Sequence, residues 1–140
     1  MNVYIDIDGV LLTKNNKIPK GGQDLISFLT KNFNCFWLTT HCRHGENKAL
    51  EYLKAFYTDT EIDLLKNVKP TNWIDLKTEG INLNSNFIWL EDYPFESEKM
   101  VLRKSKKLNS LILVDLKKKD ELKSIIQKIK FISKNEKLSL

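Results

Sequence analysis

Four short and continuously apolar runs divide the chain, and longer stretches with helical periodicity lie between them. The runs span residues 3–7, 35–38, 87–90 and 111–114. A strand with one wet face alternates apolar and polar residues, whereas a strand covered on both faces is apolar throughout. The four runs therefore predict short strands buried inside the protein.

Apolar residues at helical spacing follow the first, second and last of these runs, in residues 25–33, 49–57 and 122–132. The last pattern is the most regular, and it begins with Asp120 and Glu121, whose charges suit a helix N-terminus. Strands that alternate with helices predict a parallel sheet with helices on both faces. We therefore expect a three-layer α/β/α fold of the Rossmann-like type.

Polar side chains follow three of the predicted strands at the point where each strand ends. These residues are Asp6, Asp8, Thr39, Glu91 and Asp92. Right-handed crossovers place the carboxyl ends of parallel strands along one edge of the sheet, and ligands bind at that edge. The five side chains are therefore predicted to surround one functional site.

The two acids that follow the first strand indicate what this site binds. Residues i and i+2 of a strand share a face, so Asp6 and Asp8 are expected to lie together. Two neighbouring carboxylates repel each other unless a cation lies between them. Because magnesium prefers oxygen ligands, the sequence predicts a Mg²⁺ site.

The segment Asp6-Ile7-Asp8-Gly9-Val10-Leu11, directly after an apolar strand, resembles the first motif of the haloacid dehalogenase (HAD) superfamily. The resemblance implies that Asp6 attacks phosphorus and that Asp8 moves a proton to and from the reacting oxygens. Gly9 would permit the turn that aims Asp8 inward. An acid at the second position resembles the phosphatase branch more than the ATPase branch. The expected function is a Mg²⁺-dependent phosphatase that forms an aspartyl-phosphate.

The second apolar strand ends in Thr39 and Thr40 and resembles the second motif of the superfamily. A hydroxyl at this place, with Thr39 the better match, would hold the phosphoryl oxygens as they gain charge. Gly9, Thr40 and Arg43 are the candidates for binding the substrate. The Arg43 guanidinium can hold phosphate through two hydrogen bonds. The alternative is that this segment is only a polar loop leading into a helix.

The strand at residues 87–90 delivers Glu91 and Asp92, where the family commonly carries two aspartates. Neighbouring strand residues face opposite ways, so one acid is expected to bind the metal directly. We expect Asp92 to do so, with Asp6 and the Asp8 backbone carbonyl, while Glu91 supports the ligands from behind. The glutamate is a departure from the family pattern.

The remaining motif of the family is a single lysine, which would tie the nucleophile to the phosphate. Lys77 is the best candidate, because it precedes the strand at residues 87–90 by a short helical segment. Lys66 and Lys69 are the alternatives.

Length and composition limit the remaining possibilities. The 140 residues suffice for one domain over residues 1–140, with no room for the cap domain that many members carry. Hydrophobic residues make up 41% and charged residues 29%, which argues against a disordered chain. No apolar run approaches a membrane span, and the N-terminus lacks the pattern of a signal peptide. We expect a cytoplasmic protein with no membrane partner.

The expected partner is a phosphorylated substrate, and the charge pattern adds a nucleic acid as a candidate. The net charge is +5, and basic residues gather in segments 99–107 and 117–119. The opening motif, the strand ending in two threonines and the strand ending in two acids are also similar to small HAD domains associated with RNA-repair proteins. Capless members tend to act on bulky phosphoesters. A basic run is otherwise a solvated helix face.

Two further functions stay open at this point. One is a binding protein that keeps the fold without catalysis, which the glutamate at position 91 favours. The other is a phosphotransferase that passes the phosphoryl group to an acceptor other than water. The physiological substrate and the oligomeric state do not follow from the sequence.

Overall fold

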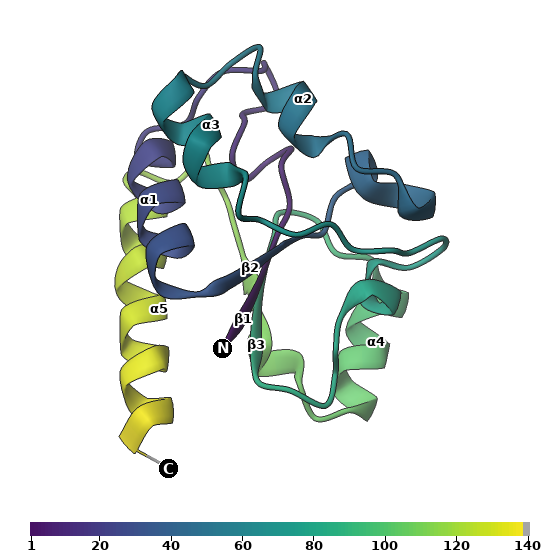
Figure 1. Cartoon of the computed structure of the whole chain (residues 1–140). Coiled ribbons are helices and arrows are strands. Elements are labelled where there is room, and N and C mark those ends of the chain that lie inside the picture. The colour runs from purple at the N-terminus through teal and green to yellow at the C-terminus, as the bar shows by residue number, and fades with distance from the viewer. Residues whose placement is uncertain (139–140) are drawn as a thin grey trace.

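The computed structural model describes residues 1–138, with side chains through residue 136, and shows an α/β fold around one parallel sheet (Figure 1). The strand order is β2-β1-β3-β4, so the first strand lies inside the sheet. The strands are β1 (Asn2–Ile5), β2 (Asn34–Trp37), β3 (Phe87–Glu91) and β4 (Leu111–Leu113). The α-helices are α1 (Gly22–Asn32), α2 (Ala49–Leu53), α3 (Asp59–Leu65), α4 (Glu96–Lys104) and α5 (Glu121–Leu138). Short 3₁₀ helices cover Thr40–Gly45, Lys77–Gly80 and Leu108–Ser110.

All four predicted strands form, but β1 ends two residues earlier than its apolar run. The chain turns after Ile5, and the backbone N–H groups of Leu11 and Leu12 both donate to the carbonyl of Ile7. Residues 10–12 are buried beneath this turn. The expected pairing of Asp6 and Asp8 on one strand face therefore does not arise, because neither residue belongs to the strand.

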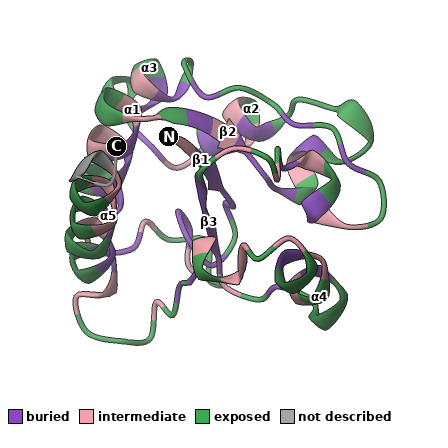
Figure 2. Ribbon diagram, turned by 90° about the horizontal axis from the view of Figure 1, so that it is seen from below, coloured by how far each residue is buried: buried purple, intermediate pink, exposed green. Residues whose placement is uncertain are grey.

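Side chains of β1 alternate between two buried clusters, one on each face of the sheet. Val3 and Ile5 belong to the larger cluster, which includes the apolar stripes of α1 and α5. Tyr4 belongs to the smaller cluster, which contains Trp89 and Leu102 of α4. Figure 2 shows the buried strands at the centre, with exposed residues on the outer sides of the helices. This double burial explains why polar residues occur only at the ends of the strands.

Two of the three predicted helices form over most of their apolar patterns, and the third is shorter than its pattern. The patterns in residues 25–33 and 122–132 form α1 and α5, which pack against each other. The pattern in residues 49–57 gives only the short α2, beyond which the hydroxyl of Tyr57 donates to the carbonyl of Leu11 at 2.7 Å. Helix α3 follows and buries Ile62 and Leu65 against the larger cluster.

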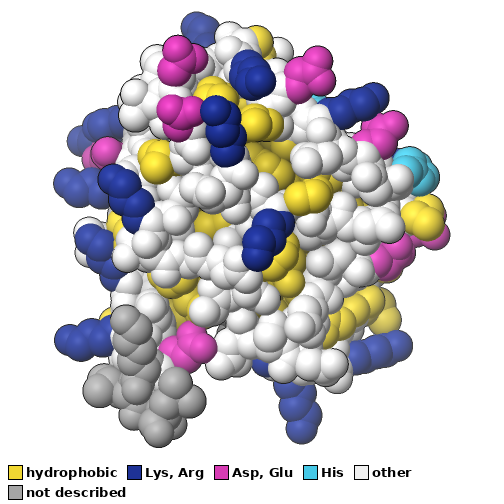
Figure 3. Space-filling model, in the orientation of Figure 1, with side chains coloured by type: hydrophobic (Ala, Val, Ile, Leu, Met, Phe, Trp, Pro, Cys, Tyr) yellow, Lys and Arg dark blue, Asp and Glu magenta, His cyan; other side chains and the backbone are white. Residues whose placement is uncertain are grey.

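The surface is rich in lysine. Figure 3 shows many Lys and Arg side chains on the side of the molecule formed by α1 and α5, with acidic side chains among them. Within residues 1–138, no helix has both the length and the apolar character needed to cross a bilayer.

Replacing Ile129 by Ala tests the packing of α5 on the sheet. Ile129 is fully buried in the larger cluster, so the variant should lose about 2–5 kcal/mol of unfolding free energy through lost burial and a cavity. The neighbouring Lys128 is exposed, and Lys128→Ala should stay within about 0.5 kcal/mol of the parent. Urea denaturation measures both values. Equal losses in the two variants would contradict this packing.

Candidate active site

Three carboxylates meet where β1 and β3 end side by side. Ile5 pairs with Leu90, so Asp6 follows β1 at the level where Glu91 ends β3, and the Asp6 backbone N–H donates to the Leu90 carbonyl at 3.2 Å. Asp92 is the next residue. One carboxylate oxygen from each of Asp6, Glu91 and Asp92 lies within 4.8 Å of the other two. We call this group the acidic cluster.

Lys77 brings a positive charge to the acidic cluster from the connection between β2 and β3. Its Nζ lies 2.9 Å from Glu91 Oε2 and 3.3 Å from Asp6 Oδ2. Lys66 and Lys69, the alternatives left by the sequence, are exposed and donate to other residues. Of the three candidate lysines, the structure brings only Lys77 to the predicted nucleophile.

Glu98 holds Lys77 in place and was missed by the sequence reasoning. This buried carboxylate of α4 accepts the Lys77 backbone N–H at 2.7 Å and the Phe95 backbone N–H at 2.8 Å. It therefore ties the lysine segment to the first turn of α4. A glutamate at the third position of a helix is a capping signal, so the start of α4 can be predicted from the sequence. The contact with a distant loop cannot.

Burial and the shortage of positive charge shift the pKa values in the acidic cluster. Burial raises the pKa of Asp6, and the nearby charge of Lys77 only partly offsets this. Burial, then the charge of Asp6, raises the pKa of Glu91 to about 9. Burial lowers the pKa of Lys77, but the charges of Asp6 and Glu91 outweigh it and the net shift is upward. Without a further cation, the site therefore retains a proton at neutral pH.

Asp8 lies outside the acidic cluster, on the exposed turn after β1. Its Oδ2 is 3.4 Å from His41 Nε2, and its Oδ1 is 3.5 Å from the hydroxyl of Tyr52. The His41 and Tyr52 rings stack with centroids 4.0 Å apart. The sequence analysis did not predict a role for Tyr52. Its only signal is the spacing of four residues from Phe56, and that spacing is typical of a helix face that packs against the core. The metal contact predicted through the Asp8 backbone carbonyl stays a prediction.

The predicted substrate-binding residues follow β2 at the same edge of the sheet. Thr39 is fully buried, whereas Thr40 and Arg43 are exposed. Thr40, Arg43 and Lys77 line one small cavity of about 170 Å³. The Arg43 guanidinium lies over the Trp73 ring, 5.4 Å from its centroid. The lining of this cavity therefore includes a hydroxyl and two cationic residues, together with the acids Asp75 and Glu98.

Gly9 permits the close approach of Asp92 to the turn after β1. Its φ of +85° is a left-handed conformation that other residues adopt at a cost. A Cβ at this position would lie 2.2 Å from Asp92 Oδ2, much closer than two atoms can approach. Gly9 is therefore required both by the turn and by the position of a cluster carboxylate.

The acidic cluster fits a divalent metal by its donor atoms and its charge. All three side chains offer carboxylate oxygens, which Mg²⁺ prefers. One ammonium against three ionised carboxylates leaves two negative charges, which one divalent cation balances. Asp6, Glu91 and Asp92 are the residues that would hold the ion. The sequence-based division, with Asp92 as ligand and Glu91 behind it, stays a prediction.

Comparisons with known protein families, with curated proteins and with solved structures find no match to this chain. The chemistry of the site therefore rests on its own residues.

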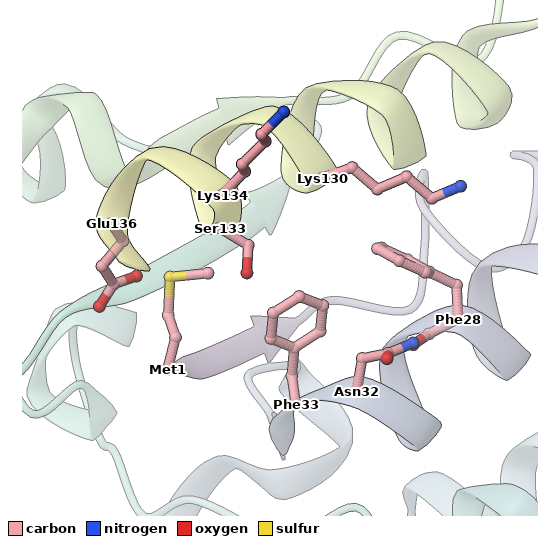
Figure 4. Close-up of a pocket in the computed structure, with 8 residues that line it drawn as sticks. All are labelled: Met1, Phe28, Asn32, Phe33, Lys130, Ser133, Lys134 and Glu136. Atoms are coloured by element: carbon pink, nitrogen blue, oxygen red, sulfur yellow. The ribbon is translucent and has the colours of Figure 1, made fainter. Parts of the chain in front are cut away.

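A larger cavity at the opposite edge of the sheet contains none of the predicted site residues. It measures about 750 Å³ and lies between the C-terminal parts of α1 and α5 (Figure 4). Phe28 and Phe33 line it from the side of α1, and the Lys130 ammonium lies 5.7 Å from the Phe28 ring centroid. Its one acidic residue, Glu136, accepts a hydrogen bond from the Asn86 side chain at 2.8 Å. No group of carboxylates converges there.

Replacing Gly9 by Ala tests the link between the turn and the acidic cluster. The added methyl displaces Asp92, so Mg²⁺ should no longer raise the melting temperature of the variant. Gly45→Ala is the matched control, because Gly45 has a φ of +77° but its Cβ would meet only Asn72, at 3.4 Å. The control should lose about 1 kcal/mol from backbone strain and keep its response to Mg²⁺. Thermal melting with and without Mg²⁺ measures both, and an unchanged response in Gly9→Ala would contradict the link.

Proposed function

We propose that this protein is a Mg²⁺-dependent phosphatase that hydrolyses a phosphomonoester through a covalent intermediate on Asp6. The observation that carries the proposal is the position of the Asp6 carboxylate. It is 5% exposed, directly follows an inner strand, lies 3.3 Å from the Lys77 ammonium and belongs to a cluster of three carboxylates. A buried carboxylate beside an ammonium group, in a cluster that a divalent cation would neutralise, suits a nucleophile that reacts with a phosphate ester.

Asp6 is the nucleophile in this proposal. Its Oδ1 accepts the Ile7 backbone N–H at 2.8 Å, while its Oδ2 lies beside Lys77, so both oxygens are oriented. Attack forms an oxygen–phosphorus bond to Asp6 and breaks the bond to the leaving oxygen. Water then cleaves the aspartyl-phosphate, which restores the carboxylate and releases inorganic phosphate.

Lys77 and Thr39 stabilise the phosphoryl group during transfer. The Lys77 ammonium neutralises charge between the nucleophile and the phosphoryl oxygens, and Glu98 fixes the backbone of the lysine. The Thr39 hydroxyl, at the end of β2, is the proposed donor to a phosphoryl oxygen. Bound Mg²⁺ would offset the repulsion between the carboxylate and the incoming phosphate.

Asp8 is the proposed general acid and base. Its carboxylate is exposed two residues after the buried nucleophile, with His41 and Tyr52 each close to one of its oxygens. A group in this position can meet the leaving oxygen of a substrate that enters from solvent. It would protonate that oxygen first and later take a proton from the attacking water.

The HAD family remains a proposal, supported by the order and location of the motifs. The parallel sheet, the acids after β1 and β3, the threonines after β2 and Lys77 all occur at one edge. We extend the proposal to a three-layer arrangement, with α1 and α5 on one face of the sheet and α4 on the other. A cytoplasmic location also stays a prediction.

A non-catalytic binding protein is the second candidate, and one observation favours it. Lys77 contacts both Asp6 and Glu91, so an internal ion pair satisfies two buried acids without any substrate. In that case Mg²⁺ would raise the melting temperature while no phosphate ester is cleaved.

Replacing Asp6 by Asn tests the proposed nucleophile. The amide cannot form the acyl phosphate, so hydrolysis of p-nitrophenyl phosphate in Mg²⁺ should fall by at least about 1,000-fold. Asp63→Asn is the matched control, because Asp63 is an exposed aspartate of α3 that pairs only with Lys66 at the surface. The control should keep the parent rate. Undiminished turnover by Asp6→Asn would refute the proposed mechanism.

Replacing Asp8 by Asn tests the proposed general acid. A poor leaving group needs a proton and a good one does not, so hydrolysis of an alkyl phosphate should fall by about 100- to 10,000-fold. Hydrolysis of p-nitrophenyl phosphate should fall much less. The kcat/KM of both substrates measures the difference, because it reports phosphoryl transfer to Asp6 and not the later hydrolysis of the shared aspartyl-phosphate. An equal loss for the two esters would assign Asp8 a structural role instead.

A further inference from the structure

Exposed apolar side chains gather around the acidic cluster. The large hydrophobic residues that are well exposed, among those described, are Ile74, Tyr93, Phe95, Met100, Leu113 and Phe131. Three of them, Tyr93, Phe95 and Leu113, line the two cavities that contain site residues. A soluble surface rarely concentrates such side chains at a reactive site without a use for them.

The larger of these two cavities includes a residue of the acidic cluster in its lining. It measures about 760 Å³, within the size range of ligand sites. Gly9 and Asp92 line it. Lys14, Lys117 and Lys118 line it as well. We call it the basic groove.

The charge of the basic groove favours a polyanion. Its lining residues include three lysines, while its acids are Asp92, which belongs to the cluster, and Asp115. Asp115 Oδ1 accepts the Lys117 backbone N–H at 3.0 Å, so this acid helps to shape the lysine-bearing turn. With a cation at the cluster, the groove presents a net positive surface to a ligand.

The structure separates the two basic segments that the sequence joins in one candidate patch. Lys117 and Lys118 follow β4 and lie at the active edge. The run 99–107 instead begins inside α4, which carries the chain back to the start of β4, so its last lysines lie at the opposite edge (Figure 1). Lys117 and Lys118 therefore share an edge of the sheet with Asp6, whereas the last lysines of the run 99–107 do not.

Tyr93 stands between the basic groove and the small cavity that contains Arg43. It lines both cavities, and its side chain is 76% exposed. Its backbone N–H donates to Glu91 Oε1 at 3.4 Å, which ties the residue to the acidic cluster. The site therefore carries an exposed aromatic ring next to the place where phosphate would react.

We propose that the basic groove binds a single-stranded nucleic acid whose terminal phosphate reaches Asp6. Tyr93 stacks on the terminal base, and Lys14, Lys117 and Lys118 contact the phosphates that follow. Aromatic rings and lysine rows are the features with which proteins hold single strands without reading their sequence. This inference deepens the proposed function and rests on it for the chemistry at the strand end.

The combination of features favours this ligand over other phosphoesters. A small phosphorylated metabolite would not extend along a groove lined by three lysines beyond the cluster. A phosphoserine or phosphothreonine peptide has no flat ring at the phosphorylated residue, and no peptide backbone carries the repeated charge of a nucleic acid. A duplex would need a wider surface than one groove beside a buried carboxylate.

Binding of a short single-stranded oligonucleotide with a terminal phosphate tests the inference without turnover. The measurement is fluorescence anisotropy with Asp6→Asn protein in Mg²⁺, over a range of salt concentrations. Adding Lys117→Ala and Lys118→Ala should weaken binding and reduce the slope of log K against log salt by about 1.4, because two phosphate contacts are lost. Adding Tyr93→Ala should weaken binding by about 5- to 150-fold, and Tyr93→Phe should restore most of it.

The matched control adds Lys123→Ala and Lys128→Ala, which remove the same charge from exposed positions on α5. This control should keep the parent affinity and salt slope. Equal weakening in the two double-lysine variants would overturn the inference, because it would show an effect of net charge alone. Absence of oligonucleotide binding, or equal competition by a phosphoserine peptide, would also overturn it.

A kinetic comparison separates this inference from the proposed function. In protein with an intact Asp6, the ratio of kcat/KM for the oligonucleotide to kcat/KM for p-nitrophenyl phosphate should fall in the Lys117→Ala, Lys118→Ala variant. An unchanged ratio would refute the groove while leaving the phosphatase intact. If the parent protein cleaves neither substrate, the proposed function fails, and the binding measurements alone decide whether the groove holds nucleic acid.

Discussion

Burial of the Asp6 carboxylate beside too little positive charge is the constraint on which the site depends. Removing an ionised carboxylate from water is costly unless a cation compensates for the lost hydration. Lys77 supplies one positive charge, but Glu91 and Asp92 bring two further acids to the same point. Burial, then the charge of Asp6, raises the pKa of Glu91 to about 9. A divalent cation would compensate for the missing positive charge, and this supports the proposed metal site.

The fold maintains this unfavourable arrangement through contacts outside the acidic cluster. The inner position of β1 places Asp6 beside the end of β3. Gly9 leaves room for Asp92, and Glu98 fixes the backbone of Lys77 through α4. These contacts come from separate parts of the chain, so each charged group is positioned by a different segment. Packing on both faces of the sheet stabilises the fold, and this offsets the cost of burying the charged groups.

Patterns local to the sequence predicted the strands, the parallel sheet and the residues that end the strands. Apolar runs and helical periodicity report burial, which local sequence encodes directly. Asp8 and Glu98 show where this reasoning stops. The position of Asp8 depends on the turn that ends β1 early, and the role of Glu98 depends on a contact with Lys77, 21 residues away in the sequence. Neither a tertiary turn nor a hydrogen bond between distant residues produces a periodic pattern in the sequence. Lys77 was predictable only from its spacing from the following strand.

The central claim is that Asp6 receives a phosphoryl group beside a cation held by the acidic cluster. A crystal structure of the protein with Mg²⁺ and beryllium fluoride, a mimic of a transferred phosphoryl group, tests it most directly. The account predicts a tetrahedral beryllium fluoride on an Asp6 carboxylate oxygen, the Lys77 ammonium beside its fluorides, and Mg²⁺ bound by Asp6 and Asp92. Mg²⁺ bound elsewhere, or a fluoride complex that does not contact Asp6, would contradict it.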